Sequence, residues 1–270
     1  MLKRCYKKFR KVMRVPRAIG RVSYADWKTR PIHFFNHIPK CGGTSLTRIL
    51  ENWFVILRDY PPHDLQFPNR DDFERAMQQH SEQIGKSLLS IRPWQIVAGH
   101  FLHSEHNVYV RYPDLMTLDR VRQITFVRDP FQQKLSLYFH GLRKNHAYIK
   151  GYSLADFICT EPNFMATCLG CSQENYKQVL DKYFFVGIVE RFQQSIEILS
   201  DMLRKPAPKK TQQLNISPRN DEPSNLSEHD INNFHQINSL DYEIFNYCKI
   251  LFARHRQQFT RLMSYEPTQI

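Results

Sequence analysis

The sequence predicts a three-layer α/β fold in which a mainly parallel central sheet lies between helices. Short apolar runs, typical of buried parallel strands, alternate along the chain with segments whose apolar residues recur at helical spacing. A pair of glycines separates the first strand from the first helix. The chain has 270 residues, of which 41% are hydrophobic and 24% charged, so it can bury a core and wholesale disorder is excluded.

The first strand, turn and helix are expected within residues 32–54. Ile32–Ile38 is an apolar, β-rich run, and Pro39–Ser45 holds the glycine pair. The helix follows with apolar residues at helical spacing: Leu46, Ile49, Leu50, Trp53 and Phe54. Three prolines predict a loop over residues 60–69, and a polar helix is expected over residues 71–89.

Three further strands are predicted: Gln95–Gly99, Gln123–Val127 and residues 184–189. Helices are expected over about residues 131–145, 154–158, 192–203 and 239–262, and the Pro- and Asn-rich residues 205–225 are expected to form a loop. We find no internal repeat. The sequence therefore predicts one α/β domain over residues 31–265, preceded by a leader over residues 1–30.

The net charge of +12 belongs almost entirely to the leader. Residues 1–30 hold eleven Lys and Arg against one acid, Asp26, which gives +10, whereas the other 240 residues hold 27 bases and 25 acids. Apolar residues recur among these bases at helical spacing, a basic amphipathic pattern. This pattern is typical of peripheral contact with an anionic membrane or partner, but a helix across the domain or a basic tail is favoured. The near-neutral body argues against dedicated nucleic-acid binding.

The sequence shows neither a run of about 18 apolar residues nor a cleavable secretory signal. Its six cysteines are too sparse for a disulfide scaffold. Cys168 and Cys171 form a single CxxC pair, which fits two ordinary thiols better than a redox pair or a zinc site.

The glycine pair predicts an anion site. Backbone N–H groups in such a turn converge on an anion, and the start of the following helix adds partial positive charge. Lys40 supplies a full charge, and Thr44 and Ser45 supply hydroxyl groups. In a Walker A loop the lysine stands immediately before a Ser or Thr, whereas here Lys40 precedes the glycines. A Mg²⁺-dependent nucleotide site is therefore disfavoured, and no metal is expected. A neutral turn with a helix cap is the alternative.

A second anion-binding group is expected at the end of the Gln123–Val127 strand. Arg128 follows this strand, Asp129 and Pro130 come next, and Ser136 lies eight residues beyond the arginine. Ligands of open α/β sheets bind at the carboxyl ends of the strands, which places Arg128 beside the first loop. Its planar guanidinium suits a phosphate, and Ser136 adds a hydroxyl. Alternatively, Arg128 and Asp129 pair locally and cap a helix.

These motifs resemble those of sulfotransferases that use 3′-phosphoadenosine 5′-phosphosulfate (PAPS). Pro39–Ser45 resembles their 5′-phosphosulfate loop, and Arg128–Pro130 with Ser136 and Tyr138 resembles their 3′-phosphate motif. Three further segments are similar to the branch that resembles heparan-sulfate 2-O-sulfotransferase, a carbohydrate sulfotransferase: Ala98–Phe101, Phe185–Phe192 and Leu240–Phe245. The resemblance runs from about residue 31 to residue 255.

The resemblance implies a fold related to P-loop kinases, PAPS as the sulfo donor and 3′-phosphoadenosine 5′-phosphate (PAP) as the product. It also implies an acceptor hydroxyl. The resemblance to the glycan branch favours a carbohydrate acceptor, and a protein tyrosine or a small molecule is the alternative. By residue, Arg128 and Ser136 would hold the 3′-phosphate, and the 5′-phosphosulfate would be held by Lys40, Cys41, Gly42, Gly43, Thr44 and Ser45. Residues 215–219 resemble a late loop near the nucleotide.

The chain departs from the family pattern at one position. The family has a second arginine five residues after the first, where this chain has Gln133 followed by Lys134. Either donor binding is weaker, or Lys134 replaces the arginine.

Sulfuryl transfer needs in-line positioning and stabilisation of the leaving oxygen, which Lys40 can supply. The acceptor hydroxyl must also lose a proton. His100, at the carboxyl end of the Gln95–Gly99 strand, is the predicted base, and the matching family position supports it. A packed core histidine is the alternative. His103 and His106 follow at a spacing that does not suit zinc, so substrate contact or plain surface is expected there.

Two other functions remain open from the sequence: a Mg²⁺-dependent nucleotide or small-molecule kinase, and a basic nucleic-acid-binding protein. The expected compartment is the cytoplasm, as for a bacterial enzyme, or the Golgi lumen if the chain is a truncated eukaryotic member.

Overall fold

The computed structural model describes residues 29–62, 70–102, 107–208 and 226–264. The leader up to residue 28, His103, His106 and residues 215–219 therefore lie outside the described residues. Contacts divide the chain into Met1–Arg30 and Pro31–Ile270, and the description that follows concerns the second unit. No described helix is long and apolar enough to span a membrane.

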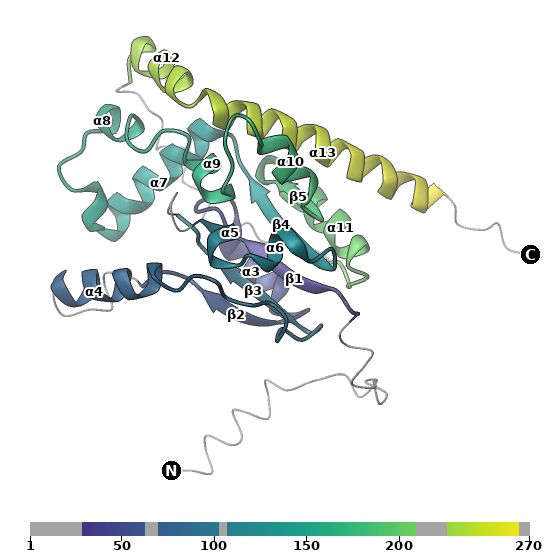
Figure 1. Ribbon diagram of the computed structural model, residues 1–270. Helices are drawn as coiled ribbons and strands as arrows, with labels where there is room; N and C mark the ends of the chain where they lie inside the picture. The colour runs from purple at the N-terminus through teal and green to yellow at the C-terminus, as the bar shows by residue number, and fades with distance from the viewer. Residues whose placement is uncertain (1–28, 63–69, 103–106, 209–225, 265–270) are drawn as a thin grey trace, which may run out of the picture. The chain divides into compact units, whose positions relative to one another are not determined.

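Five parallel strands form the central sheet in the order β2-β3-β1-β4-β5 (Figure 1). The strands are β1 (Ile32–Asn36), β2 (Val55–Asp59), β3 (Gln95–Gly99), β4 (Val121–Val127) and β5 (Phe185–Ile188). β1 occupies the centre, where Phe35 lies opposite Ala98 of β3 and Ile124 of β4. All five residues of β1 are buried, as expected of a strand covered on both faces.

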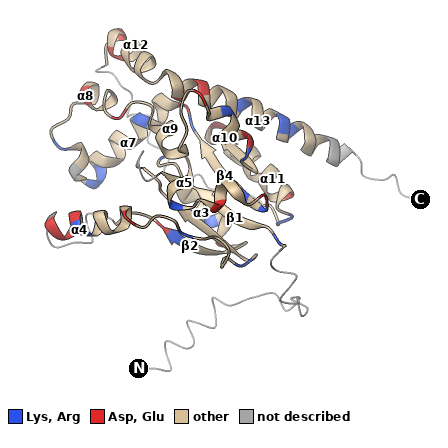
Figure 2. Ribbon diagram, in the orientation of Figure 1, with Lys and Arg blue, Asp and Glu red and all other residues tan. Residues whose placement is uncertain are grey.

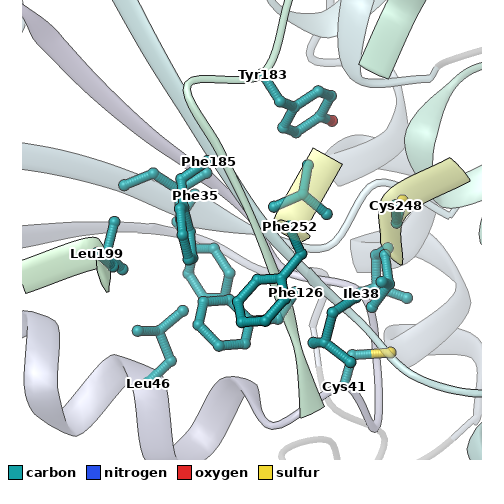
Figure 3. Close-up of a cluster of buried hydrophobic side chains, with 14 of the residues drawn as sticks. Phe35, Ile38, Cys41, Leu46, Phe126, Tyr183, Phe185, Leu199, Cys248 and Phe252 are labelled. Atoms are coloured by element: carbon teal, nitrogen blue, oxygen red, sulfur yellow. The ribbon is translucent and has the colours of Figure 1, made fainter. Parts of the chain in front are cut away.

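Neighbouring residues of a strand point to opposite faces of the sheet, so Phe34 and Phe35 belong to different hydrophobic clusters. Phe35 packs in the larger cluster with Leu46, Phe126 and Leu199 (Figure 3). Phe34 packs in the second cluster, which contains Val97, Val108, Tyr112 and Leu115. A sheet with a core on each face is the predicted three-layer α/β architecture, which is thus confirmed.

The helices that surround the sheet differ in length from one turn to seven. Their bounds are α3 (Gly43–Leu50), α4 (Arg70–Ser81), α5 (Val108–Arg111), α6 (Asp114–Thr117), α7 (Pro130–Lys144), α8 (Leu154–Ile158), α9 (Phe164–Leu169), α10 (Tyr176–Asp181), α11 (Phe192–Met202), α12 (Glu228–Ile237) and α13 (Ser239–Ser264), with 3₁₀ turns η2 (Ala147–Ile149) and η3 (Val189–Arg191). The long α13 runs beside α9, α10 and α11 and contacts β5 (Figure 1).

Three expectations about the elements were wrong in detail. β2 was not predicted, because its apolar residues Val55, Ile56 and Leu57 directly follow Trp53 and Phe54, which the helical spacing assigned to the first helix. The first helix ends at Leu50, before Trp53 and Phe54. These two residues lie in the turn that follows, and they fit the apolar pattern of the helix because their side chains also pack in the core. The polar helix ends at Ser81, well before residue 89.

α12 was also not predicted, although its sequence carries a start signal. Ser227 and Asp230 form a capping box, in which the serine hydroxyl accepts from the Asp230 amide and the Asp230 carboxylate accepts from the Ser227 amide. The domain bounds of 31–265 stay a prediction.

Candidate functional site

The site is built from three segments that leave the carboxyl ends of neighbouring strands. His37 follows β1, His100 follows β3 and Arg128 follows β4. Because the three strands are parallel and adjacent, their carboxyl ends lie at one edge of the sheet. The topology therefore brings together the loop, the histidine and the arginine that the sequence singled out.

The loop between β1 and α3 owes its shape to two left-handed residues, Lys40 (φ 65°) and Gly42 (φ 73°). Gly42 is the N-cap of α3, and as a glycine it has no side chain to cover the first-turn amides. A β-carbon at Gly42 would also lie 3.1 Å from the Phe192 ring. The first-turn amides of Gly43 and Thr44 belong to the four that an α-helix leaves without an internal carbonyl partner, so they can serve an anion.

The other loop residues differ in what they can offer. The Thr44 side chain is exposed, whereas Ser45 is buried. The Cys41 amide donates to the Ile38 carbonyl at 3.2 Å, and its buried thiol has a raised pKa because of that burial. The Arg128 backbone partly opposes this rise in pKa, which indicates that the Cys41 thiol lies near the end of β4.

The second segment begins with Arg128, which is half-buried, and continues into α7. Asp129 caps α7 by accepting from the Gln132 amide at 3.0 Å, and Pro130 occupies the first helical turn. The Asp129 carboxylate is thus used in the helix cap, as the alternative reading of this motif proposed. That cap leaves the Arg128 guanidinium without a described carboxylate within 4.0 Å.

One face of α7 lies against the loop. Gln133, Ser136, His140 and Arg143 recur at intervals of three or four residues and so share this face. The Gln133 amide donates to the Pro39 carbonyl at 2.9 Å, and Ser136 is buried. Gln133 therefore supports the loop from the position at which the family has an arginine.

Lys134 points away from this face and does not replace that arginine. Its Nζ donates to the Thr160 carbonyl at 2.5 Å and lies 4.9 Å from the centroid of the Phe157 ring. Lys134 is buried, and burial lowers its pKa. Its role is to join α7 to the turn that follows α8.

Positive charge accumulates around Lys40. Burial, followed by the charges of Arg143 and Arg128, lowers the pKa of Lys40 to about 8. The pKa of His140 is lowered to about 4 by burial, then by Lys40, His146 and Arg143. Among the described residues, no carboxylate lies within 4.0 Å of Lys40. Lys40 and Arg128, which raise each other's electrostatic energy and have no described carboxylate within 4.0 Å, are suited to an anionic ligand.

His100 is held in one tautomer. Its Nδ1 lies 2.6 Å from the His37 carbonyl oxygen, which can only accept, so Nδ1 carries the proton and Nε2 has the free lone pair. Burial lowers the pKa of His100 to about 4, and the bond to the carbonyl opposes that shift. The neutral ring at pH 7 can therefore accept a proton at Nε2.

His37 and Tyr60 support this ring. The centroid of the His100 ring lies 4.3 Å from that of His37 and 4.7 Å from that of Tyr60. His37 Nδ1 and the Tyr60 hydroxyl are hydrogen-bonded at 3.0 Å. The His37 ring also fills the space beside Gly43, where a β-carbon would lie 1.6 Å from Nε2. His37 is thus a packed support between α3 and His100.

Behind Tyr60 lies a buried ion pair that the sequence reasoning missed. Arg111 donates to both Asp59 carboxylate oxygens, from Nε at 2.7 Å and from Nη2 at 2.6 Å, and the Tyr112 hydroxyl donates to the same carboxylate at 2.6 Å. These bonds hold the pKa of Asp59 well below its usual range, against the effect of burial. They fix the end of β2 and therefore the residue that follows it, Tyr60.

The CxxC pair and the Leu240–Phe245 segment have structural roles in the part of the chain that the structure describes. Cys168 is buried and Cys171 is half-buried, and all five described cysteines are free thiols. In residues 29–62, 70–102, 107–208 and 226–264, no group of three or more His, Cys, Asp or Glu could hold a metal ion. Asp241, from the Leu240–Phe245 segment, accepts from the Met165 and Ala166 amides at 2.9 Å and so caps α9.

Among known proteins, one family model matches most of the chain, and solved structures of low identity match as well. A family model described as "Sulfotransferase family" matches residues 29–248. Among the solved structures, a sulfotransferase from Alicyclobacillus acidocaldarius is 16% identical, with a TM-score of 0.39 over 77% of this chain and 95% of that one. Mouse sulfotransferase SULT7A1 complexed with PAP is 17% identical, with a TM-score of 0.41 over 87% of this chain and 89% of that one. No curated protein matches the sequence.

Proposed function

The chain belongs to the sulfotransferase family, and from that premise we propose that it transfers a sulfo group from PAPS to a hydroxyl of a carbohydrate. One observation carries the proposal: Lys40, Arg128 and the amides at the start of α3 lie at one edge of the sheet, and no carboxylate of the described residues lies within 4.0 Å of either cation. PAPS offers two anionic groups to such a site.

In this proposal the 5′-phosphosulfate lies against the loop. Lys40, the backbone of Gly42 and Gly43, and the amides and hydroxyls of Thr44 and Ser45 bind it, as the family resemblance implies. Cys41, whose amide donates to the Ile38 carbonyl, keeps the loop in shape beside the donor. Anionic oxygens beside Lys40 favour its charged form and raise its pKa, so the lysine is a full cation when the donor is bound. Arg128 and Ser136 bind the 3′-phosphate, and no metal is required.

His100 acts as the general base. Its Nε2 takes the proton of the acceptor hydroxyl while the hydroxyl oxygen forms a bond to sulfur. The bond between sulfur and the bridging oxygen of the donor breaks, and its electron pair leaves with the phosphate of PAP. Lys40 stabilises the charge that develops on this oxygen. The negative donor close by raises the pKa of His100 towards the neutral range that general-base catalysis needs.

The acceptor is assigned from the family and from three of its motifs. Family membership implies a hydroxyl-bearing acceptor, and the preference for a carbohydrate rests on the resemblance of Ala98–Phe101, Phe185–Phe192 and Leu240–Phe245 to one branch. Contact of residues 1–30 with an anionic membrane or partner stays a prediction.

A transfer assay tests the proposal. The purified protein is incubated with radiolabelled PAPS and a panel of saccharides, beside tyrosine peptides and small phenols. We expect label on a saccharide, loss of at least about 100-fold in kcat for His100→Ala, and PAP affinity unchanged in that variant. Full transfer by His100→Ala would reject the base, and label only on peptides or phenols would reject the carbohydrate.

A further inference from the structure

A second cluster of cations lies at the opposite end of the sheet from the candidate site. Arg122 is the second residue of β4, and Arg204 and Lys205 follow the end of α11, where Figure 2 shows blue residues. The Lys205 Nζ donates to the Trp53 carbonyl at 3.4 Å, just before β2. The Arg122 guanidinium lies 4.7 Å from the centroid of the Phe184 ring, just before β5. The cluster therefore spans the amino ends of the strands.

These cations repel one another. The pKa of Arg122 is lowered by burial and then by Arg204. The pKa of buried His33 is lowered to about 3 by burial, then by Arg122 and Lys205. Within the described residues, no carboxylate lies within 4.0 Å of Arg122, Arg204 or Lys205. The carbonyls at the end of α11 attract Arg204 and Lys205, but they do not account for Arg122, which belongs to a strand.

Large apolar side chains are exposed beside these cations. Trp94 is 49% exposed and Val55 is 51% exposed. The Val55 amide donates to the Trp94 carbonyl at 2.8 Å, so the two residues lie together at the amino ends of β2 and β3. Tryptophan is enriched where proteins meet the membrane–water interface, and clustered cations attract anionic lipid headgroups. The combination of charge and apolar surface favours a membrane over a soluble polyanion.

We propose that this amino edge, defined as Val55, Trp94, Arg122, Arg204 and Lys205, docks onto a membrane surface that carries anionic phospholipid. Pro31, the first residue of the domain, directly precedes β1 at this edge. A five-residue strand is about 15 Å long, which separates the edge from Lys40 and His100. Docking therefore leaves the sulfo-transfer site open to donor and acceptor.

The test measures sedimentation of the full chain with phosphatidylcholine vesicles, with and without phosphatidylserine. We expect binding only with phosphatidylserine and weaker binding as salt rises. The variant R122Q/R204Q/K205Q is expected to lower the partition coefficient by about 100-fold, whereas the charge-preserving R122K/R204K/K205R retains it. A matched control, K177Q/K249Q/R256Q, removes three exposed cations from α10 and α13 and is expected to bind like the wild type.

Two results would overturn the proposal in this assay: unchanged binding by R122Q/R204Q/K205Q, or an equal loss in the control. Tighter binding to duplex DNA than to the vesicles would also overturn it. Brominated lipids provide a second readout, because they quench tryptophans that enter the interface. Quenching is expected to decrease in Trp94→Phe, and an undiminished signal would place Trp94 outside the interface. PAP affinity, measured on the same variants, separates failure of this proposal from failure of the sulfotransferase proposal.

Discussion

Replacing Gly43 by alanine is expected to displace the His37 ring, because the new β-carbon would lie 1.6 Å from His37 Nε2. The ring cannot simply rotate away. Its other nitrogen, Nδ1, is hydrogen-bonded to the Tyr60 hydroxyl, and its faces lie against Phe35 and His100. The carbonyl of His37 also accepts the bond that orients His100. A single methyl group on α3 therefore disturbs the proposed base.

The cost is the sum of three effects. Overpacking of a filled site costs about 1–3 kcal/mol, and loss of the bond between His37 and Tyr60 costs about 1 kcal/mol. Alanine favours the helix over glycine by about 1 kcal/mol, which offsets part of this. We expect the free energy of unfolding to fall by about 1–3 kcal/mol.

Urea unfolding of a double-mutant cycle measures this effect. In a His37→Ala background the ring is absent, so Gly43→Ala should no longer destabilise the protein. The interaction free energy between the two substitutions should then be about as large as the loss of unfolding free energy that Gly43→Ala causes alone. Additive effects of Gly43→Ala and His37→Ala would refute the reasoning, because the clash would then not be the cause.

Three other predictions concern the supports of the site. Asp59→Asn is expected to lower the free energy of unfolding by about 3–5 kcal/mol, because it removes the charge that neutralises buried Arg111, and urea unfolding at pH 7 checks this. Lys134→Met should leave the calorimetric Kd for PAP unchanged, and a large increase would return Lys134 to the donor site. PAP affinity should be nearly constant between about pH 7 and pH 8, where the PAP phosphates, with second pKa values of about 6, keep their full charge. It should decline above pH 8 by up to about tenfold per pH unit, because the free Lys40 has a pKa of about 8 and loses its charge there; affinity that rises above pH 8 would contradict this.

The pH dependence of transfer follows from His100. Burial lowers the pKa of His100 to about 4 in the free protein. Above about pH 4 the ring is therefore neutral and can act as a base. The acid limb of kcat/KM should therefore lie near pH 4, whereas the limb of kcat should lie higher because bound donor raises the pKa.

The parts of the site that lie within one local motif could be predicted from the sequence. The Gly42–Gly43 pair stands between an apolar run and a helical pattern, and Arg128 ends another apolar run, so strand order alone brings them to one edge. His100 was predicted for the same reason, since it follows the apolar run of β3. Each depends on residues a few positions apart.

The supports could not be predicted, because they join residues far apart in the chain. Asp59 and Arg111 are 52 positions apart and Gln133 and Pro39 are 94 apart, and no local pattern pairs them. A weaker signal was available on α7, where Gln133, Ser136, His140 and Arg143 share a face. β2 was missed because its apolar residues, Val55–Leu57, continue directly from Trp53 and Phe54, which the helical spacing assigned to the preceding helix.

Calorimetric titration with PAP, and separately with ATP and Mg²⁺, tests the central claim most directly. The proposed donor site predicts PAP binding that needs no metal and that weakens at least about tenfold in Arg128→Ala, since a charged hydrogen bond contributes about 1.5–3 kcal/mol. Binding of ATP only with Mg²⁺, together with no binding of PAP, would contradict the sulfotransferase account and favour a kinase.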